Sequence, residues 1–152
     1  MRPAIFIARA DPAEPTVRVL IDGLDAYQQV LYPAASNHLL DIETLRLPQM
    51  RFFVATVDGV ARGCGGCWLH DRYAEIKRVY VDPKARGMGL AKKMMAHIEN
   101  EARMAGMQLA RLETGIHQPE ALGLYRALGY VVRGPFGDYV EDPNSVFMEK
   151  PL

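Results

Sequence analysis

The sequence has few cysteines, a single tryptophan, no excess of either charge and no long apolar run. Its two cysteines cannot supply a network of disulfides or all four thiolates of a cysteine-only structural zinc site. The 18 basic residues balance 18 acidic ones, so the net charge of zero gives no reason to expect a nucleic-acid or membrane partner. No apolar segment approaches the roughly 20 residues of a membrane-spanning helix, and the first residues lack the apolar core of a signal peptide. We therefore expect a cytoplasmic protein.

The residues that are present predict a globular protein with a buried core. The chain of 152 residues is 49% hydrophobic and 24% charged, which is typical of soluble domains of this length. No repeat, linker or low-complexity segment divides it. We therefore expect a single domain over residues 1–152.

Apolar residues alternate in some segments and recur every three or four residues in others, as strands and helices require. Strands are expected at residues 4–9, 52–57, 60–69, 75–81, 107–113, 130–132 and 145–149. Helices are expected at residues 16–31, 41–45, 90–105 and 119–128. This order of elements predicts an α/β fold with a mixed central sheet of about six or seven strands flanked by about four helices.

The most informative segment runs from Val79 to Lys92 and joins an apolar strand to an amphipathic helix. Gly87 and Gly89 let the backbone approach a ligand closely, and the N–H groups of a first helical turn bind anions. Apolar side chains recur every four residues from Leu90, so the helix begins directly after the glycines. The segment therefore predicts a diphosphate-binding loop and a nucleotide-like cofactor.

A dinucleotide-binding fold is the alternative for the same loop. Its Gly-x-Gly-x-x-Gly fingerprint is followed, one strand later, by an acidic residue, and Glu113 stands about where that acid belongs. However, Lys92 occupies the third glycine position, and the loop follows the Asp82-Pro83 turn rather than the strand itself. This alternative predicts binding of NAD.

Two motifs resemble those of a known family. Arg86-Gly-Met-Gly-Leu-Ala91 matches the Arg/Gln-x-x-Gly-x-Gly/Ala signature of the GNAT superfamily of N-acetyltransferases. The segment from Gln118 to Tyr130 resembles its Asn-x-x-Ala-x-x-Leu-Tyr-x-x-x-Gly-Phe segment, with Gln118 in place of the asparagine. Glu113-Thr-Gly115 and Phe136-Gly-Asp-Tyr139 also make the chain similar to the bacterial subgroup labelled indole-acetate acetyltransferases.

The resemblance implies an enzyme that moves the acetyl group of acetyl-CoA to an amine by direct attack in a ternary complex. The expected acceptor is a small molecule, amino-acid-like or aromatic; the alternatives are a protein or peptide amine, or an acyl-CoA-binding regulator without turnover. A homodimer through the terminal strands is a further expectation. The residues implied to bind acetyl-CoA are Val79, Val81, Arg86, Gly87, Met88, Gly89, Leu90, Ala91, Gln118 and Tyr125.

Transfer to an amine requires removal of a proton from the amine, stabilisation of a developing oxyanion and protonation of the thiolate. Glu75 is the candidate base, with His117 as its rival and a surface ion pair with Lys77 as the alternative interpretation. On a regular strand Glu75 would share a face with Lys77 and Val79. The resemblance implies that Tyr125 protonates the thiolate and that the Val79 N–H binds the oxyanion.

The acceptor pocket is expected where the first helical connection meets the last hairpin, which carry aromatic and polar side chains. Asp138 could attract an ammonium, and Arg51, Arg72 or Arg78 could hold a carboxylate. The expected pocket residues are Tyr32, Asn37, His38, His117, Phe136 and Asp138.

Cys64-Gly-Gly-Cys67 has the spacing of a redox pair or of half a zinc site. The chain holds no second cysteine pair, and the motif lies within an expected strand, where positions 64 and 67 point to opposite faces. We expect two small buried side chains here and no metal.

Overall fold

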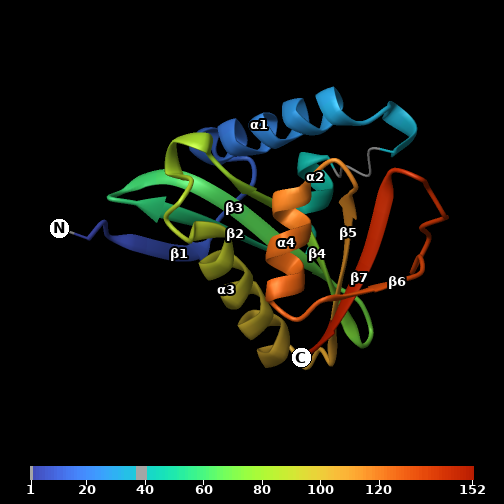
Figure 1. Cartoon of the computed structure of the whole chain (residues 1–152). Helices are drawn as coiled ribbons and strands as arrows, with labels where there is room; N and C mark the ends of the chain where they lie inside the picture. Colours follow the sequence, from blue (N-terminus) through green and yellow to red (C-terminus); the bar gives the residue numbers. More distant parts are fainter. Residues whose placement is uncertain (1, 37–40) are drawn as a thin grey trace.

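The computed structural model describes residues 2–36 and 41–152, which form one mixed sheet with helices on both of its faces (Figure 1). The strand order is β1-β2-β3-β4-β5-β7-β6. The strands are β1 (Ile5–Arg9), β2 (Met50–Val57), β3 (Val60–Leu69), β4 (Tyr73–Val81), β5 (Leu109–Gly115), β6 (Val131–Arg133) and β7 (Ser145–Pro151). The helices are α1 (Pro15–Leu31), α2 (Ile42–Leu45), α3 (Leu90–Met104) and α4 (Pro119–Ala127).

The observed elements confirm the predicted α/β fold, with boundaries that move by a few residues. β5, for example, begins at Leu109 rather than at residue 107. Among the described strands only β4 and β5 pair in parallel, and the other five pairings are antiparallel. A dinucleotide-binding fold needs a mostly parallel sheet, so that interpretation of the glycine loop is wrong.

The helices form two layers, one on each face of the sheet, and each layer packs on the sheet through its own apolar core. The larger core joins α3 and α4 to one face of the sheet, where Met94, Ile98 and Tyr125 pack together with Ile76. The smaller core joins α1 and α2 to the other face. The site described below lies where the central strands between these layers diverge.

Cys64 and Cys67 face opposite layers, as the strand pattern predicted. Cys64 belongs to the core under α1, and Cys67 belongs to the core under α3. Burial raises the pKa of each thiol to about 12, so both stay protonated and unreactive near neutral pH. Within residues 2–36 and 41–152, no cluster of histidine, cysteine and acidic side chains could hold a metal ion.

Strands β4 and β5 lie side by side over only part of their lengths. Their parallel pairing runs from Tyr73, opposite Leu109, to Ile76, opposite Leu112. Beyond that point β4 continues to Val81 and β5 to Gly115 with no pairing between them. The sheet therefore opens in its centre.

A β-bulge at Arg78 changes which side chains face each layer. The register between β3 and β4 shifts by one residue here, and Arg78 has a φ of 62°, which is rare for a residue with a side chain. The buried guanidinium forms an ion pair with Asp25 of α1. The bulge turns Val79 toward α3, so the prediction that Val79 shares a face with Glu75 is wrong.

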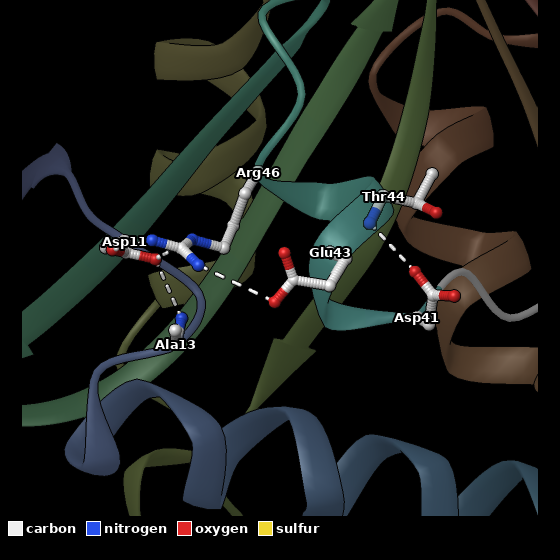
Figure 2. Close-up of polar contacts among 6 residues, drawn as sticks. All are labelled: Asp11, Ala13, Asp41, Glu43, Thr44 and Arg46. Atoms are coloured by element: carbon white, nitrogen blue, oxygen red, sulfur yellow. Dashed lines mark hydrogen bonds and ion pairs between the residues drawn. The ribbon is translucent and has the colours of Figure 1, made fainter.

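The short helix α2 is fixed by polar contacts at both of its ends (Figure 2). The Asp41 carboxylate accepts a hydrogen bond from the Thr44 N–H at 2.8 Å, a typical N-cap. Arg46 then pairs with Asp11 at 3.1 Å and with Glu43 at 3.6 Å. No helix among the described residues is long and apolar enough to cross a bilayer.

Candidate functional site

The glycine loop adopts the conformation that its sequence predicts. Gly87 and Gly89 have φ values of 80° and 71°, and Gly89 directly precedes the first residue of α3. A Cβ at either glycine would meet no protein atom within 4 Å, so the backbone conformation and not local crowding requires glycine. The first N–H groups of α3 have no partner within the helix, and they lie where an anion would bind.

A cleft of about 330 Å³ begins beside this loop and runs along the end of β4 to α4. We call it the loop-side cleft; it is lined by Leu24, Tyr27, Val79, Tyr80, Val81, Pro83, Arg86, Ala91, Gln118, Glu120, Ala121, Leu124 and Tyr125. The predicted cofactor residues Met88 and Leu90 point elsewhere: Met88 packs against the core and Leu90 is buried in it. Only their backbone groups are therefore placed to meet a ligand.

A second, smaller cavity of about 110 Å³ fills the opening between β4 and β5. We call it the central cavity; it is lined by Leu24, Gln28, Tyr32, Ser36, Ile76, Lys77, Arg78, Val79, Leu112, Glu113, Thr114, Gly115, Gln118, Ala121, Tyr125, Tyr139 and Asn144. It shares five residues with the loop-side cleft, Leu24, Val79, Gln118, Ala121 and Tyr125, and three of these, Val79, Gln118 and Tyr125, are predicted cofactor residues. The two spaces thus meet at the predicted cofactor residues.

Tyr125 projects from α4 to the border between these two spaces. Its side chain is 8% exposed. Burial, followed by the nearby Glu113 carboxylate, raises the pKa of Tyr125 to about 12. Its hydroxyl therefore keeps its proton at any physiological pH and is available as a donor.

The dinucleotide-binding alternative used Glu113 as its acidic residue, whereas the structure places Glu113 in this site. It lines the central cavity from the end of β5, and burial raises its pKa from 4.5 to about 7. The Ser145 hydroxyl and the Lys77 ammonium oppose this rise, but burial dominates. A carboxyl group that is half ionised near neutral pH is well matched to proton transfer. The Glu113-Thr-Gly115 sequence marked the position, but its burial depends on distant parts of the chain.

Glu75 lies close by but has several polar partners. It is 7% exposed; it accepts a hydrogen bond from the Tyr139 hydroxyl at 2.6 Å and pairs with Lys77 at 3.1 Å. His70 approaches it at 3.4 Å, and Lys77 also donates to Tyr139 at 2.8 Å. Glu75 does not line the central cavity, although Lys77 and Tyr139 do.

Tyr32 connects α1 to the start of α4. Its hydroxyl donates to the Gln118 side chain at 3.1 Å and accepts from the His117 N–H at 3.1 Å. A Cβ at Gly115 would lie 1.7 Å from that hydroxyl, so glycine is required there for close approach. Gln118 does not cap α4 with its side chain, and His117 is exposed and stacks on the Tyr32 ring.

The other predicted acceptor residues are less closely grouped. Phe136 is buried among Tyr73, Tyr139 and Phe147 and lines neither space described so far. Asp138 is exposed at the rim of a further cavity beside the β3–β4 hairpin. The predicted residues at positions 37 and 38, Asn37 and His38, lie outside the described part of the chain.

This further cavity has a volume of about 740 Å³. We call it the hairpin-side cavity; it is lined by Thr44, Trp68, His70, Tyr73, Glu75, Lys77, Gly137, Asp138, Tyr139 and Val140. It shares Lys77 and Tyr139 with the central cavity. Three spaces therefore follow one another: the loop-side cleft, the central cavity and the hairpin-side cavity.

Comparison with known proteins agrees with this geometry. The chain is 47% identical over 152 residues to a protein named IAA acetyltransferase from Azospirillum brasilense, covering 99% of each. A solved structure from Klebsiella pneumoniae, classed as an acyl-CoA N-acyltransferase, is 38% identical, covers 97% of each chain and has a TM-score of 0.83. The PaiA N-acetyltransferase of Thermoplasma acidophilum, solved with coenzyme A, shares the fold at 17% identity, 98% and 99% coverage and a TM-score of 0.75. The family model for acetyltransferases (GNAT) matches residues 19–130, and the chain therefore belongs to the GNAT family of acetyltransferases.

Proposed function

We propose that this acetyl-CoA-dependent N-acetyltransferase acetylates the amine of a small molecule, which attacks directly while both substrates are bound. The observation that carries the proposal is the central cavity. It joins the loop-side cleft, with its anion-binding loop, to the half-buried Glu113 carboxyl group, whose pKa is about 7. Its volume of about 110 Å³ leaves room for an acetyl group and an amine but for little else.

The loop-side cleft fits the acetyl donor. The diphosphate would bind at the glycine loop, where a helix N-terminus is combined with a positive charge. It would contact the first N–H groups of α3, the backbone of Gly87 and Gly89, and the Arg86 side chain. Acetyl-CoA, when bound, supplies the acetyl group as a thioester. Tyr125, at the far end of the cleft, would lie near the sulfur and donate its hydroxyl proton to the departing thiolate.

Glu113 is the base that the geometry favours. At its raised pKa the carboxylate would take a proton from the acceptor's ammonium group inside the central cavity. The Val79 backbone N–H, beside the same cavity, would donate to the acetyl oxygen as negative charge develops there. The acceptor's ammonium group must lose two protons: Glu113 would take the first before attack, and the second, released from nitrogen once the C–N bond has formed, would restore the Tyr125 hydroxyl after that residue has given its proton to sulfur.

Glu75 stays a prediction as the base, and its three partners support a different task. A carboxylate that contacts Tyr139, Lys77 and His70 fixes the positions of those groups. If Glu75 were the base, Glu75→Gln would lower turnover and shift its pH dependence. If Glu75 only positions its neighbours, Glu75→Gln raises KM and leaves the pH dependence of kcat unchanged.

Ligand-dependent unfolding followed by product analysis tests the proposed function. Acetyl-CoA at a hundred times its Kd should stabilise the chain by about 2.7 kcal/mol, whereas NAD should not. Incubation with a panel of small amines should then give products heavier by one acetyl group. Stabilisation without any product would instead favour a regulator that binds acyl-CoA.

Initial rates distinguish direct attack from an acetyl-enzyme. Varying acetyl-CoA at several amine concentrations should give intersecting lines in double-reciprocal plots, because both substrates must be bound together. Parallel lines would indicate a covalent intermediate and would contradict the ternary complex. The expectation follows from the two thiols, which are buried and stay protonated near neutral pH.

A further inference from the structure

The central cavity cannot hold a whole acceptor. Its volume of about 110 Å³ is that of a few water-sized groups, which the acetyl group and the amine would occupy. The rest of the acceptor must leave this space, and the loop-side cleft is taken by the donor. The hairpin-side cavity borders the central cavity at Lys77 and Tyr139, which are hydrogen-bonded to each other at 2.8 Å, and it is the neighbouring space that the donor does not occupy.

The hairpin-side cavity has the size and walls of a small-molecule site. Its volume of about 740 Å³ lies within the range of roughly 300–1,000 Å³ that is typical of ligand pockets. Trp68, His70, Tyr73 and Tyr139 contribute rings to it. Flat side chains of this kind favour offset or edge contacts with another aromatic ring.

Its walls are already held in place. His70 stacks on Tyr73 with ring centroids 4.3 Å apart, and Glu75 contacts both His70 and Tyr139. Thr44 lines the cavity from α2, which is fixed by the capping and ion-pair contacts of Figure 2. A preformed wall loses little conformational entropy when a ligand binds.

The charges around the cavity favour a neutral or cationic occupant. Glu75 and Asp138 contribute two carboxylates, whereas Lys77 contributes one ammonium that is already paired with Glu75. Asp138 is exposed at the rim, so an anionic acceptor would meet like charge as it enters.

We propose that the hairpin-side cavity binds the aromatic body of an arylalkylamine acceptor, whose amine reaches Glu113 past Lys77 and Tyr139. This inference rests on the proposed function, because it names the acceptor class of the same reaction. It assigns a binding surface to Trp68, His70 and Tyr73 of the β3–β4 hairpin. In this arrangement Glu75 positions His70 and Tyr139 in the wall of the cavity.

The fluorescence of Trp68 tests the assignment without any turnover, since it is the chain's single tryptophan and lines the cavity. Full-length protein with CoA is titrated with 2-phenylethylamine, 2-phenylethanol and n-butylamine, under excitation that tyrosine does not absorb. The two aryl compounds should give a saturable change and n-butylamine should give none. An absence of saturable change with 2-phenylethylamine would overturn the inference.

Substitution at Trp68 provides a second measurement. Calorimetry should show that Trp68→Leu weakens 2-phenylethylamine binding about three- to tenfold, the value of one aromatic contact, while Trp68→Phe restores most of it. Val19→Ala, on the exposed surface of α1, serves as the matched control and should bind like the wild type. Equal affinity in wild type and Trp68→Leu would contradict the aromatic subsite.

Kinetics separate a failure of this inference from a failure of the proposed function. Trp68→Leu should lower kcat/KM for 2-phenylethylamine by a similar factor and lower that for n-butylamine less, because n-butylamine has no ring to contact Trp68. If wild type acetylates both amines and Trp68→Leu affects neither, the subsite is wrong although the enzyme is an amine acetyltransferase. If the aryl compounds bind saturably but no amine is acetylated, the subsite stands and the proposed function fails.

Discussion

Replacing Glu113 by glutamine should slow the enzyme and stabilise its fold. Glutamine keeps the shape of the side chain but cannot take a proton from the amine. Loss of a general base typically lowers turnover by about 10²–10⁴-fold. In wild type, kcat/KM should rise with pH and level off above about 7, the pKa that burial gives Glu113, and this inflection should vanish in Glu113→Gln.

The effect on stability has the opposite sign. Folding raises the pKa of Glu113 from 4.5 to about 7, so the contribution of this group is fully present below 4.5 and is lost as the pH rises through about 7. The difference corresponds to a cost on the order of 3 kcal/mol above pH 7, which the neutral glutamine avoids. Urea unfolding at pH 8 should therefore find Glu113→Gln more stable than wild type, with the difference shrinking toward pH 4.

Glu141→Gln is the matched control, because Glu141 is exposed in the loop that precedes β7 and lines none of the three cavities. It should change neither the pH profile nor the unfolding free energy by more than about 0.5 kcal/mol. A Glu113→Gln enzyme with normal turnover and an unchanged inflection would refute the assignment of the base. A variant no more stable than wild type at pH 8 would refute the claim that burial controls this carboxyl group.

Three further substitutions test the geometry around the site. Gly89→Val should leave the chain folded, because a Cβ there meets no protein atom. It should abolish the acetyl-CoA-dependent rise in Tm, because valine does not readily adopt the positive φ that the loop requires. A normal rise in Tm would refute the assignment of the diphosphate loop. Gly115→Ala should displace Tyr32 and cost about 1–3 kcal/mol in urea unfolding, and an unchanged midpoint would contradict the close approach. Arg78→Gly should be about 1 kcal/mol more stable than Arg78→Ala, because glycine adopts a positive φ without strain; equal stabilities would refute strain at the bulge.

The sequence predicts those parts of the fold that depend on neighbouring residues. The order of strands and helices follows from hydrophobic periodicity, and the glycine loop follows from Gly87 and Gly89 at the start of a helix. Opposite faces for Cys64 and Cys67 follow from strand geometry, because β3 is regular between them.

Features that depend on contacts across the fold are not visible in the sequence. The bulge at Arg78 arises from the register between β3 and β4, so an alternating pattern places Val79 on the wrong face. The raised pKa of Glu113 arises from burial between strands that are distant in the chain. The same holds for Trp68, which reads as an ordinary strand residue until the β6–β7 loop is placed beside it.

The opening between β4 and β5 gives the molecule two strand edges in its interior. Past Ile76 and Leu112 each strand is paired on its outer side, β4 with β3 and β5 with β7, while the sides that face each other share no ladder. Backbone N–H and C=O groups along such edges require hydrogen-bond partners, which a bound ligand or water can supply. The two halves of the sheet meet along a seam of only four paired positions, from Tyr73 to Ile76. A ligand in this opening would therefore bridge the two halves of the sheet at the point where their own ladder ends.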